Sequence, residues 1–198
     1  MVTVRGQAHT LEAVAAGMVL LASVVFALQV TAVTPLSAST ASQHIENQQQ
    51  AAAGVLDAAR DNGSLDGAIR YWDDSVGSFH GTAVGGSYTT ETEIDNTAFG
   101  RMLLRTFEPR GVAFNVYFSF ESSTGTLDRR QFIYRGEPSD HAVTATTTVT
   151  LADDDPLYAP NGTPTNVTVN DSSTYFAPGR SPTGLYNVVR VEVVVWRM

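Results

Sequence analysis

The sequence predicts an α+β protein, in which a long hydrophobic, transmembrane N-terminal helix continues into a helical stalk packed on an antiparallel β-sheet domain. Three observations support this fold class. An uncharged apolar run extends from Ala13 to Val33, an apolar helical stripe follows between Ile45 and Ala59, and strict two-residue alternation begins at Val112. The first two patterns favour helices, and the third is typical of a strand with one buried face.

The charged residues are strongly biased in type. The net charge is −8, all 12 basic residues are Arg, and 20 residues are acidic. A carboxylate-rich, Lys-free surface is typical of halophilic proteins kept soluble in concentrated salt, although a high-GC genome also replaces Lys by Arg. The acidic balance argues against a nucleic acid partner. The absence of Cys excludes disulfides, thiolate metal sites and cysteine nucleophiles.

The run from Ala13 to Val33 is long enough to cross a membrane. As a helix it would extend about 31 Å, which is close to the thickness of the hydrocarbon core of a bilayer. It has no polar stripe, so a buried helix of a soluble protein is the less favoured alternative. A secretory signal cleaved near Ser37-Ala38-Ser39 is a second alternative.

Arg5 is the only basic residue before this run, and basic residues mark the cytoplasmic side of a membrane helix. The sequence therefore predicts a single-pass protein of the cell membrane, in contact with lipid, that has four parts. These are a cytoplasmic leader (1–7), a transmembrane or filament-core helix (8–34), an extracellular helical segment (35–76) and an extracellular β-rich domain (77–198).

The helical segment outside the membrane is predicted to contain breaks. Pro35 should kink or end the membrane helix. The apolar stripe then continues to Ala59, and Asn62-Gly63 is expected to end that helix. Ser64 is expected to cap a short following helix, and another helix is expected near Thr97–Phe107.

Alternating patterns predict the strands of the β-rich domain. Val112–Glu121 alternates apolar and polar residues and should bury one face, and Arg130–Arg135 should return as its hairpin partner. Ala142–Leu151 alternates apolar residues with threonines. Tyr186–Trp196 is rich in Val on both faces, which is typical of a central strand.

The segment from 153 to 183 is rich in proline, glycine and asparagine and is expected to be a long exposed loop. Three aromatic residues, Tyr158, Tyr175 and Phe176, lie within it. They either form an exposed binding patch or pack the loop against the domain.

No pattern in the sequence predicts an enzyme or a bound cofactor. The four histidines are scattered without metal-ligand spacing. Asp153, Asp154 and Asp155 are the one weak metal candidate, because three loop carboxylates could share Ca²⁺. Their spacing is not that of a calcium loop, so an acidic turn in solvent explains them better.

Four Asn-x-Ser/Thr motifs are present, and each is a glycosylation acceptor only in a secreted loop. Three of the four fall within the turn-rich segment 153–183, which favours surface glycosylation of that segment. The candidate acceptors are Asn62, Asn161, Asn166 and Asn170.

The start of the chain carries a recognisable processing motif. Residues 5–29 read RGQAHTLEAVAAGMVLLASVVFALQ, which joins Arg5-Gly6-Gln7-Ala8 to Thr10-Leu11-Glu12 and then to the apolar run. This stretch resembles the class III signal peptide of type IV pilin-like proteins in its archaeal Gly-Gln form. Together with the Lys-free acidic composition and the C-terminal YNVVRVEVVVWRM, it looks like pilin-like proteins of haloarchaea.

The resemblance implies cleavage by a membrane prepilin peptidase on the cytoplasmic side, followed by packing of the apolar helix with those of other pilin-like subunits. It also implies that Glu12 pairs with the free N-terminal amine of a neighbouring subunit. Cleavage at Gly6–Gln7 makes Glu12 mature residue six, and cleavage at Gln7–Ala8 makes it residue five, which is the family's position. The family's Gly at the cut favours the Gly6–Gln7 bond, whereas the family's position of the glutamate favours the Gln7–Ala8 bond. Both bonds therefore remain candidates for cleavage.

We therefore expect a pilin-like structural subunit, minor rather than major, of a cell-surface filament or secretion-type assembly. The alternative is a monomeric, signal-anchored extracellular binding protein without filament assembly. An enzymatic function would require a metal at Asp153–Asp155.

Overall fold

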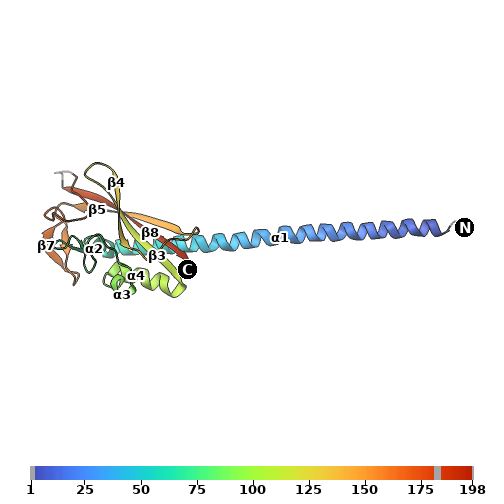
Figure 1. Cartoon of the computed structure of the whole chain (residues 1–198), viewed down its shortest axis with the longest axis horizontal. Helices are drawn as coiled ribbons and strands as arrows, with labels where there is room; N and C mark the ends of the chain where they lie inside the picture. Colours follow the sequence, from blue (N-terminus) through green and yellow to red (C-terminus); the bar gives the residue numbers. More distant parts are fainter. Residues whose placement is uncertain (1–2, 181–183, 198) are drawn as a thin grey trace. The chain divides into compact units, whose positions relative to one another are not determined.

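The computed structural model describes residues 3–180 and 184–197, and within helix α1 it describes the side chains of residues 9–29 and of residues from 43 onward. It is α+β and has a long apolar N-terminal helix and an antiparallel sheet domain, as predicted (Figure 1). The chain divides into two compact units, Met1–His44 and Ile45–Met198.

Helix α1 extends over Thr3–Asp61 and does not end at Pro35. The predicted end of the helix at Pro35 is therefore wrong. A proline removes one backbone hydrogen bond, and a helix with many bonds on either side tolerates that loss. The predicted end at Asn62-Gly63 is confirmed, because Gly63 adopts a left-handed conformation with a φ of 74° that stops the helix.

The second unit contains a four-stranded antiparallel sheet in the order β4-β3-β8-β5. The predicted hairpin of β3 with β4 is confirmed, and so is the central place of the Val-rich strand β8. The strands are β3 (Val112–Glu121), β4 (Leu127–Ile133), β5 (Val143–Ala152) and β8 (Leu185–Arg197).

Short helices and two small two-stranded sheets complete this unit. The helices are α2 (Ser64–Ile69), α3 (Glu91–Ile94), α4 (Ala98–Phe107) and the 3₁₀ turn η1 (Glu108–Arg110). One small sheet pairs β1 (Trp72–Asp73) with β2 (Ser78–Phe79), and the other pairs β6 (Pro156–Tyr158) with β7 (Pro164–Thr168). The region from 153 to 183 is thus not purely a loop, because it contains the β6–β7 hairpin. The prediction that Ser64 caps α2 is wrong, because Gly63 occupies the N-cap position and Ser64 is the first helical residue. The Asn62 side chain accepts the Ser64 N–H at 2.9 Å.

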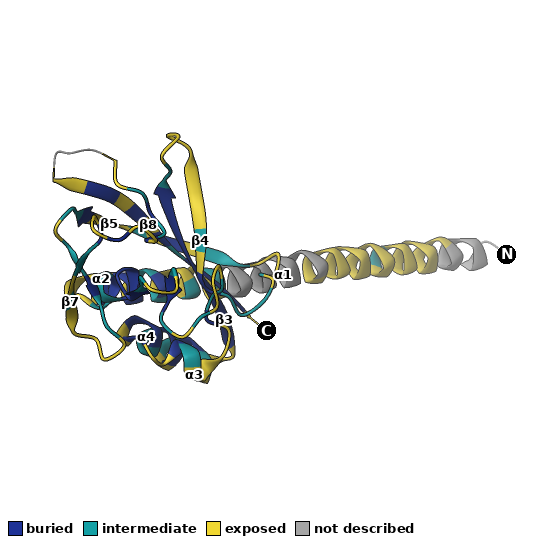
Figure 2. Cartoon of the chain, turned by 60° about the vertical axis from the view of Figure 1, so that its left-hand side comes forward, coloured by how far each residue is buried: buried dark blue, intermediate teal, exposed yellow. Residues whose placement is uncertain are grey.

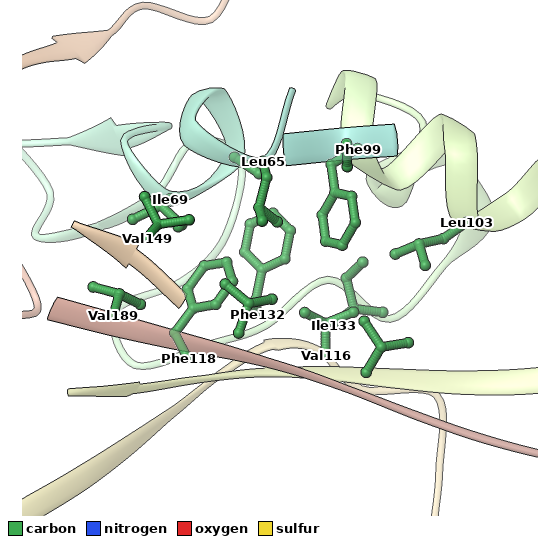
Figure 3. Close-up of a cluster of buried hydrophobic side chains, with 14 of the residues drawn as sticks. Leu65, Ile69, Phe99, Leu103, Val116, Phe118, Phe132, Ile133, Val149 and Val189 are labelled. Carbon is green, nitrogen blue, oxygen red and sulfur yellow. The ribbon is translucent and has the colours of Figure 1, made fainter. Parts of the chain in front are cut away.

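One face of the large sheet carries the main hydrophobic core. Figure 3 shows side chains of α2 and α4, such as Leu65 and Phe99, pointing toward side chains of the strands, such as Phe118 and Phe132. Phe79 of β2 lies among these aromatic rings, with its ring centroid 4.9 Å from that of Phe132. The same buried cluster includes four side chains near the end of α1: Ala52, Val55, Leu56 and Ala59.

Strand β3 differs from its prediction, because both of its faces are buried. The segment that follows β4 covers the face turned away from the main core. There, the Asn115 side chain donates to the Gly136 carbonyl at 2.8 Å and accepts from the Arg135 N–H at 2.7 Å. A second buried cluster forms under this cover from Ala113, Tyr117, Val194 and Trp196. The alternation predicted the strand correctly, but it could not predict a cover supplied by a loop.

Candidate functional site

The segment His9–Gln29 of α1 is long and apolar enough to cross a membrane, with a mean hydropathy of 2.3. Figure 2 shows this stretch almost entirely in the colour of exposed residues. Its ten large apolar side chains are between 51% and 73% exposed: Leu11, Val14, Met18, Val19, Leu20, Leu21, Val24, Val25, Phe26 and Leu28.

Transfer of this exposed surface to an apolar environment would be strongly favourable. Burial of one large apolar side chain is worth about 1.5–3 kcal/mol. Ten such side chains correspond to roughly 15–30 kcal/mol, whereas a whole domain is stable by only about 5–15 kcal/mol. Lipid, or other apolar helices, would supply this environment.

The polar groups inside the segment are compatible with such an environment. The Ser23 hydroxyl lies 2.7 Å from the Val19 carbonyl and 3.0 Å from the Leu20 carbonyl, so the helix itself satisfies it. Gly17 is open, because a side chain added there would meet no described atom within 4 Å. Small residues of this kind let helices approach one another closely.

Glu12 lies at the N-terminal edge of this apolar segment and is 78% exposed at its side chain. One of its carboxylate oxygens lies 3.5 Å from Nδ1 of His9, one helical turn earlier. The three-residue spacing on a helix is the sequence signal for this pairing, which was not predicted. The carboxylate is thus accessible to a further partner.

The predicted processing residues Gly6, Gln7 and Ala8 belong to helix α1, but their side chains lie outside the described residues. The structure therefore places them on the turns before Glu12 without a description of their side chains.

Within the acidic run Asp153–Asp155, the Asp155 side chain is part of the scaffold. One oxygen of Asp155 lies 3.2 Å from Nη1 of Arg70, and the other accepts the Ala152 N–H at 2.8 Å. Within the described ranges, no three His, Cys, Asp or Glu side chains come together in a way that could hold a metal ion. Asp155 therefore ties the β6–β7 region to α2.

The aromatic residues of the same region mostly pack the fold. Tyr175 is buried and donates its hydroxyl to the Ile69 carbonyl at 3.1 Å, and this burial raises the pKa of its phenol. Phe176 packs on its neighbour Tyr175, with ring centroids 4.6 Å apart. Tyr158 is only partly buried and lines a groove that has no local signal in the sequence.

The four candidate acceptor asparagines are all exposed, but their motif hydroxyls differ in surroundings. The Thr163 hydroxyl donates to the Asn161 side chain at 2.7 Å, in an exposed turn. The hydroxyl of Ser172, two residues after Asn170, is buried and donates to the carboxylate of Asp74. Asn62 and Asn161 both line the groove that Tyr158 faces.

A family model described as "Family of unknown function (DUF7288)" matches residues 5–195. No curated protein and no solved structure matches the chain.

Proposed function

The chain belongs to the DUF7288 family of unknown function, and we propose that it is a pilin-like structural subunit of a cell-surface filament or secretion-type assembly. The observation that carries this proposal is the exposed apolar segment His9–Gln29, directly preceded by the Arg5-Gly6-Gln7 motif. The membrane retains the subunit before assembly, and the apolar helices of neighbouring subunits replace the lipid afterwards.

The topology follows from the position of the apolar segment. Residues 1–7 are a cytoplasmic leader for a prepilin peptidase, and the residues after 34 are extracellular, since Arg5 is the only basic residue before the segment. The last turns of α1 act as a stalk for the sheet domain. Burial of Ala52, Leu56 and Ala59 supports this part of the proposal.

Glu12 supplies the assembly contact. A carboxylate at the edge of an apolar helix bundle costs free energy unless it finds a partner. The free amine that cleavage creates on a neighbouring subunit would be such a partner. The 78% exposure of the Glu12 side chain supports this role, because it leaves the carboxylate accessible to a neighbouring subunit.

The first experiment determines the mature N-terminus of the full chain in cells that contain a prepilin peptidase. Mass spectrometry should find a protein that begins at Gln7 or Ala8. Gly6→Asp should block this cut, whereas Gly17→Ala, in the open part of the helix, should leave it unchanged. An intact Met1 would favour the monomeric, signal-anchored alternative, and a start near Ser39 would identify a secretory signal.

The second experiment separates assembly from anchoring. Glu12→Gln should be cleaved normally but disappear from the filament fraction sheared off the cells. Glu46→Gln is the matched control, because Glu46 is also exposed on α1 but lies beyond the apolar segment. Normal recovery of the Glu12→Gln protein in sheared filaments would refute the assembly role of this residue.

A further inference from the structure

A groove of about 670 Å³ lies in the second unit, between α2, α4 and the turn of the β6–β7 hairpin. Two hydrogen bonds join the residues after α2 to the β6–β7 hairpin, which form two of its walls. The Tyr71 hydroxyl donates to the Pro160 carbonyl at 3.0 Å, and the Tyr158 N–H donates to the Arg70 carbonyl at 2.9 Å. The groove is therefore preformed, and its volume is typical of small-ligand sites.

The charge of the groove is opposite to that of the chain. The net charge of the chain is −8, yet the described residues that line the groove include Arg101 and Arg105 and no Asp or Glu. These two arginines are one turn apart on α4. Neither forms an ion pair with a described carboxylate, in contrast to Arg70 and Arg129.

Arg101 is better placed than Arg105 to bind a ligand in the groove. Its Nη1 donates to the Asp95 carbonyl at 2.5 Å, which holds the side chain in position while the rest of the guanidinium remains available. Its positive charge is close enough to Tyr71 to oppose the rise in pKa that burial gives that phenol. Arg105 is more exposed and also borders a neighbouring hollow that contains Glu108.

The remaining lining offers neutral hydrogen-bonding groups and aromatic rings. Three asparagines line the groove, Asn62, Asn96 and Asn161, together with Tyr71, which is mostly buried, and the partly buried Tyr158. The Asn62 oxygen already accepts the Ser64 N–H at 2.9 Å, and the Asn161 oxygen accepts the Thr163 N–H at 3.1 Å. These two amides therefore offer N–H donors, which suit the oxygen atoms of a ligand with many hydroxyl groups. An arginine fork suits a carboxylate, and an aromatic ring presents an apolar surface to a sugar ring.

We propose that this groove binds an acidic saccharide, with Arg101 binding the sugar carboxylate and the asparagine amides binding hydroxyl groups. A single inorganic anion would use the arginines but leave the amides and the rings unused. The proposal does not depend on filament assembly, since every lining residue belongs to the second unit.

The test measures binding by isothermal titration calorimetry on the full chain in nanodiscs of neutral lipid. The protein should come from a host that adds no N-glycans, because Asn62 and Asn161 line the groove. The probes are trigalacturonate and maltotriose, which are an acidic and a neutral trisaccharide. Trigalacturonate should bind, and maltotriose should bind at least about ten-fold more weakly, because a hydrogen bond to a charged group is the larger contribution.

Two variants locate the site. Arg101→Gln should weaken trigalacturonate binding about ten-fold or more, and Arg110→Gln should change it less than about two-fold, because Arg110 is exposed but does not line the groove. Hydrogen exchange of peptides that cover 61–72 and 95–106 should slow on binding. Exchange in 143–152, which covers strand β5, should not change.

Three results would overturn the proposal. These are no heat with trigalacturonate, equal affinity for maltotriose, and equal losses in the Arg101 and Arg110 variants. A circular dichroism melt of each variant separates loss of binding from loss of folding, and Arg105→Gln provides a second test within the same groove if Arg101→Gln unfolds. An Arg105→Gln protein with unchanged affinity would then refute the site.

Discussion

Gly100 lies in the first turn of α4, where that helix passes close to the end of α3. A Cβ atom added at this position would lie 2.0 Å from the backbone oxygen of Ile94 and 2.8 Å from Oγ1 of Thr97. Thr97 caps the helix, and its hydroxyl accepts the Gly100 N–H at 2.9 Å. Replacement of Gly100 by Ala therefore forces α3 and α4 apart and disturbs the cap.

The expected change in the free energy of unfolding is a balance of three contributions. Ala is favoured over Gly in a helix interior by about 1 kcal/mol. Overpacking against a backbone atom costs about 1–3 kcal/mol, and loss of an N-cap bond costs about 1 kcal/mol. Gly100→Ala should thus destabilise the protein by about 1–3 kcal/mol.

The assay is urea unfolding of the full chain in a neutral detergent, followed by the fluorescence of the two buried tryptophans, Trp72 and Trp196. The matched control is Gly54→Ala on α1, where an added Cβ meets nothing within 4 Å. That variant should be stabilised by up to about 1 kcal/mol. A Gly100→Ala protein as stable as the parent would refute the reasoning from this contact.

Three further predictions concern the core and the carboxylates. Phe79→Ala should destabilise the protein by about 3–5 kcal/mol in the same urea assay, because the ring is fully buried among other aromatic rings, and a loss below about 1 kcal/mol would contradict this. Hydrogen bonds from the backbone of Thr89 and Thr90 hold the pKa of Glu93 below its usual value. The Glu93 carboxylate therefore stabilises the fold above its unfolded pKa of about 4.5, and this contribution is lost as the pH falls through the folded pKa. The melting temperature of Glu93→Gln should differ from that of the parent at pH 6 and converge with it near pH 3. A hydrogen bond with Glu91 raises the pKa of Glu108, so the stabilisation by protonated Glu108 is present below its unfolded pKa and is lost as the pH rises through its folded pKa. Glu108→Gln should therefore gain stability relative to the parent between pH 4 and pH 7. A constant difference in stability over that range would show that Glu91 does not shift the titration of Glu108.

The sequence predicted those elements whose signal is local. The uncharged run before Val33, the alternation of β3 and the Val-rich strand β8 each depend on residues within one segment, and all three appear in the structure. The β1–β2 pair was missed, because two-residue strands leave no periodic pattern. The helix through Pro35 was missed, because a local penalty can be outweighed by the hydrogen bonds on either side.

The candidate sites likewise differ in whether their residues are neighbours in the sequence or only in the fold. Glu12 and its apolar neighbours are contiguous, so sequence reasoning could single them out. The groove brings together Asn62, Arg101 and Asn161, which are about 40 and 60 residues apart along the chain. Only the packing of α2, α4 and the β6–β7 hairpin places them together. The partnership of Asp155 with Arg70 likewise links distant segments, which is why the acidic run resembled a free metal site.

The hydroxyl of Ser172 has a consequence for the order of events during maturation. An N-glycosylation motif consists of the asparagine together with the hydroxyl two residues later. In the folded domain the Ser172 hydroxyl is buried against Asp74, whereas that of Thr163 lies in an exposed turn. A glycan on Asn170 would therefore have to be attached before the domain folds, while Asn161 stays available afterwards. Occupancy of these two asparagines would thus report whether modification preceded or followed folding.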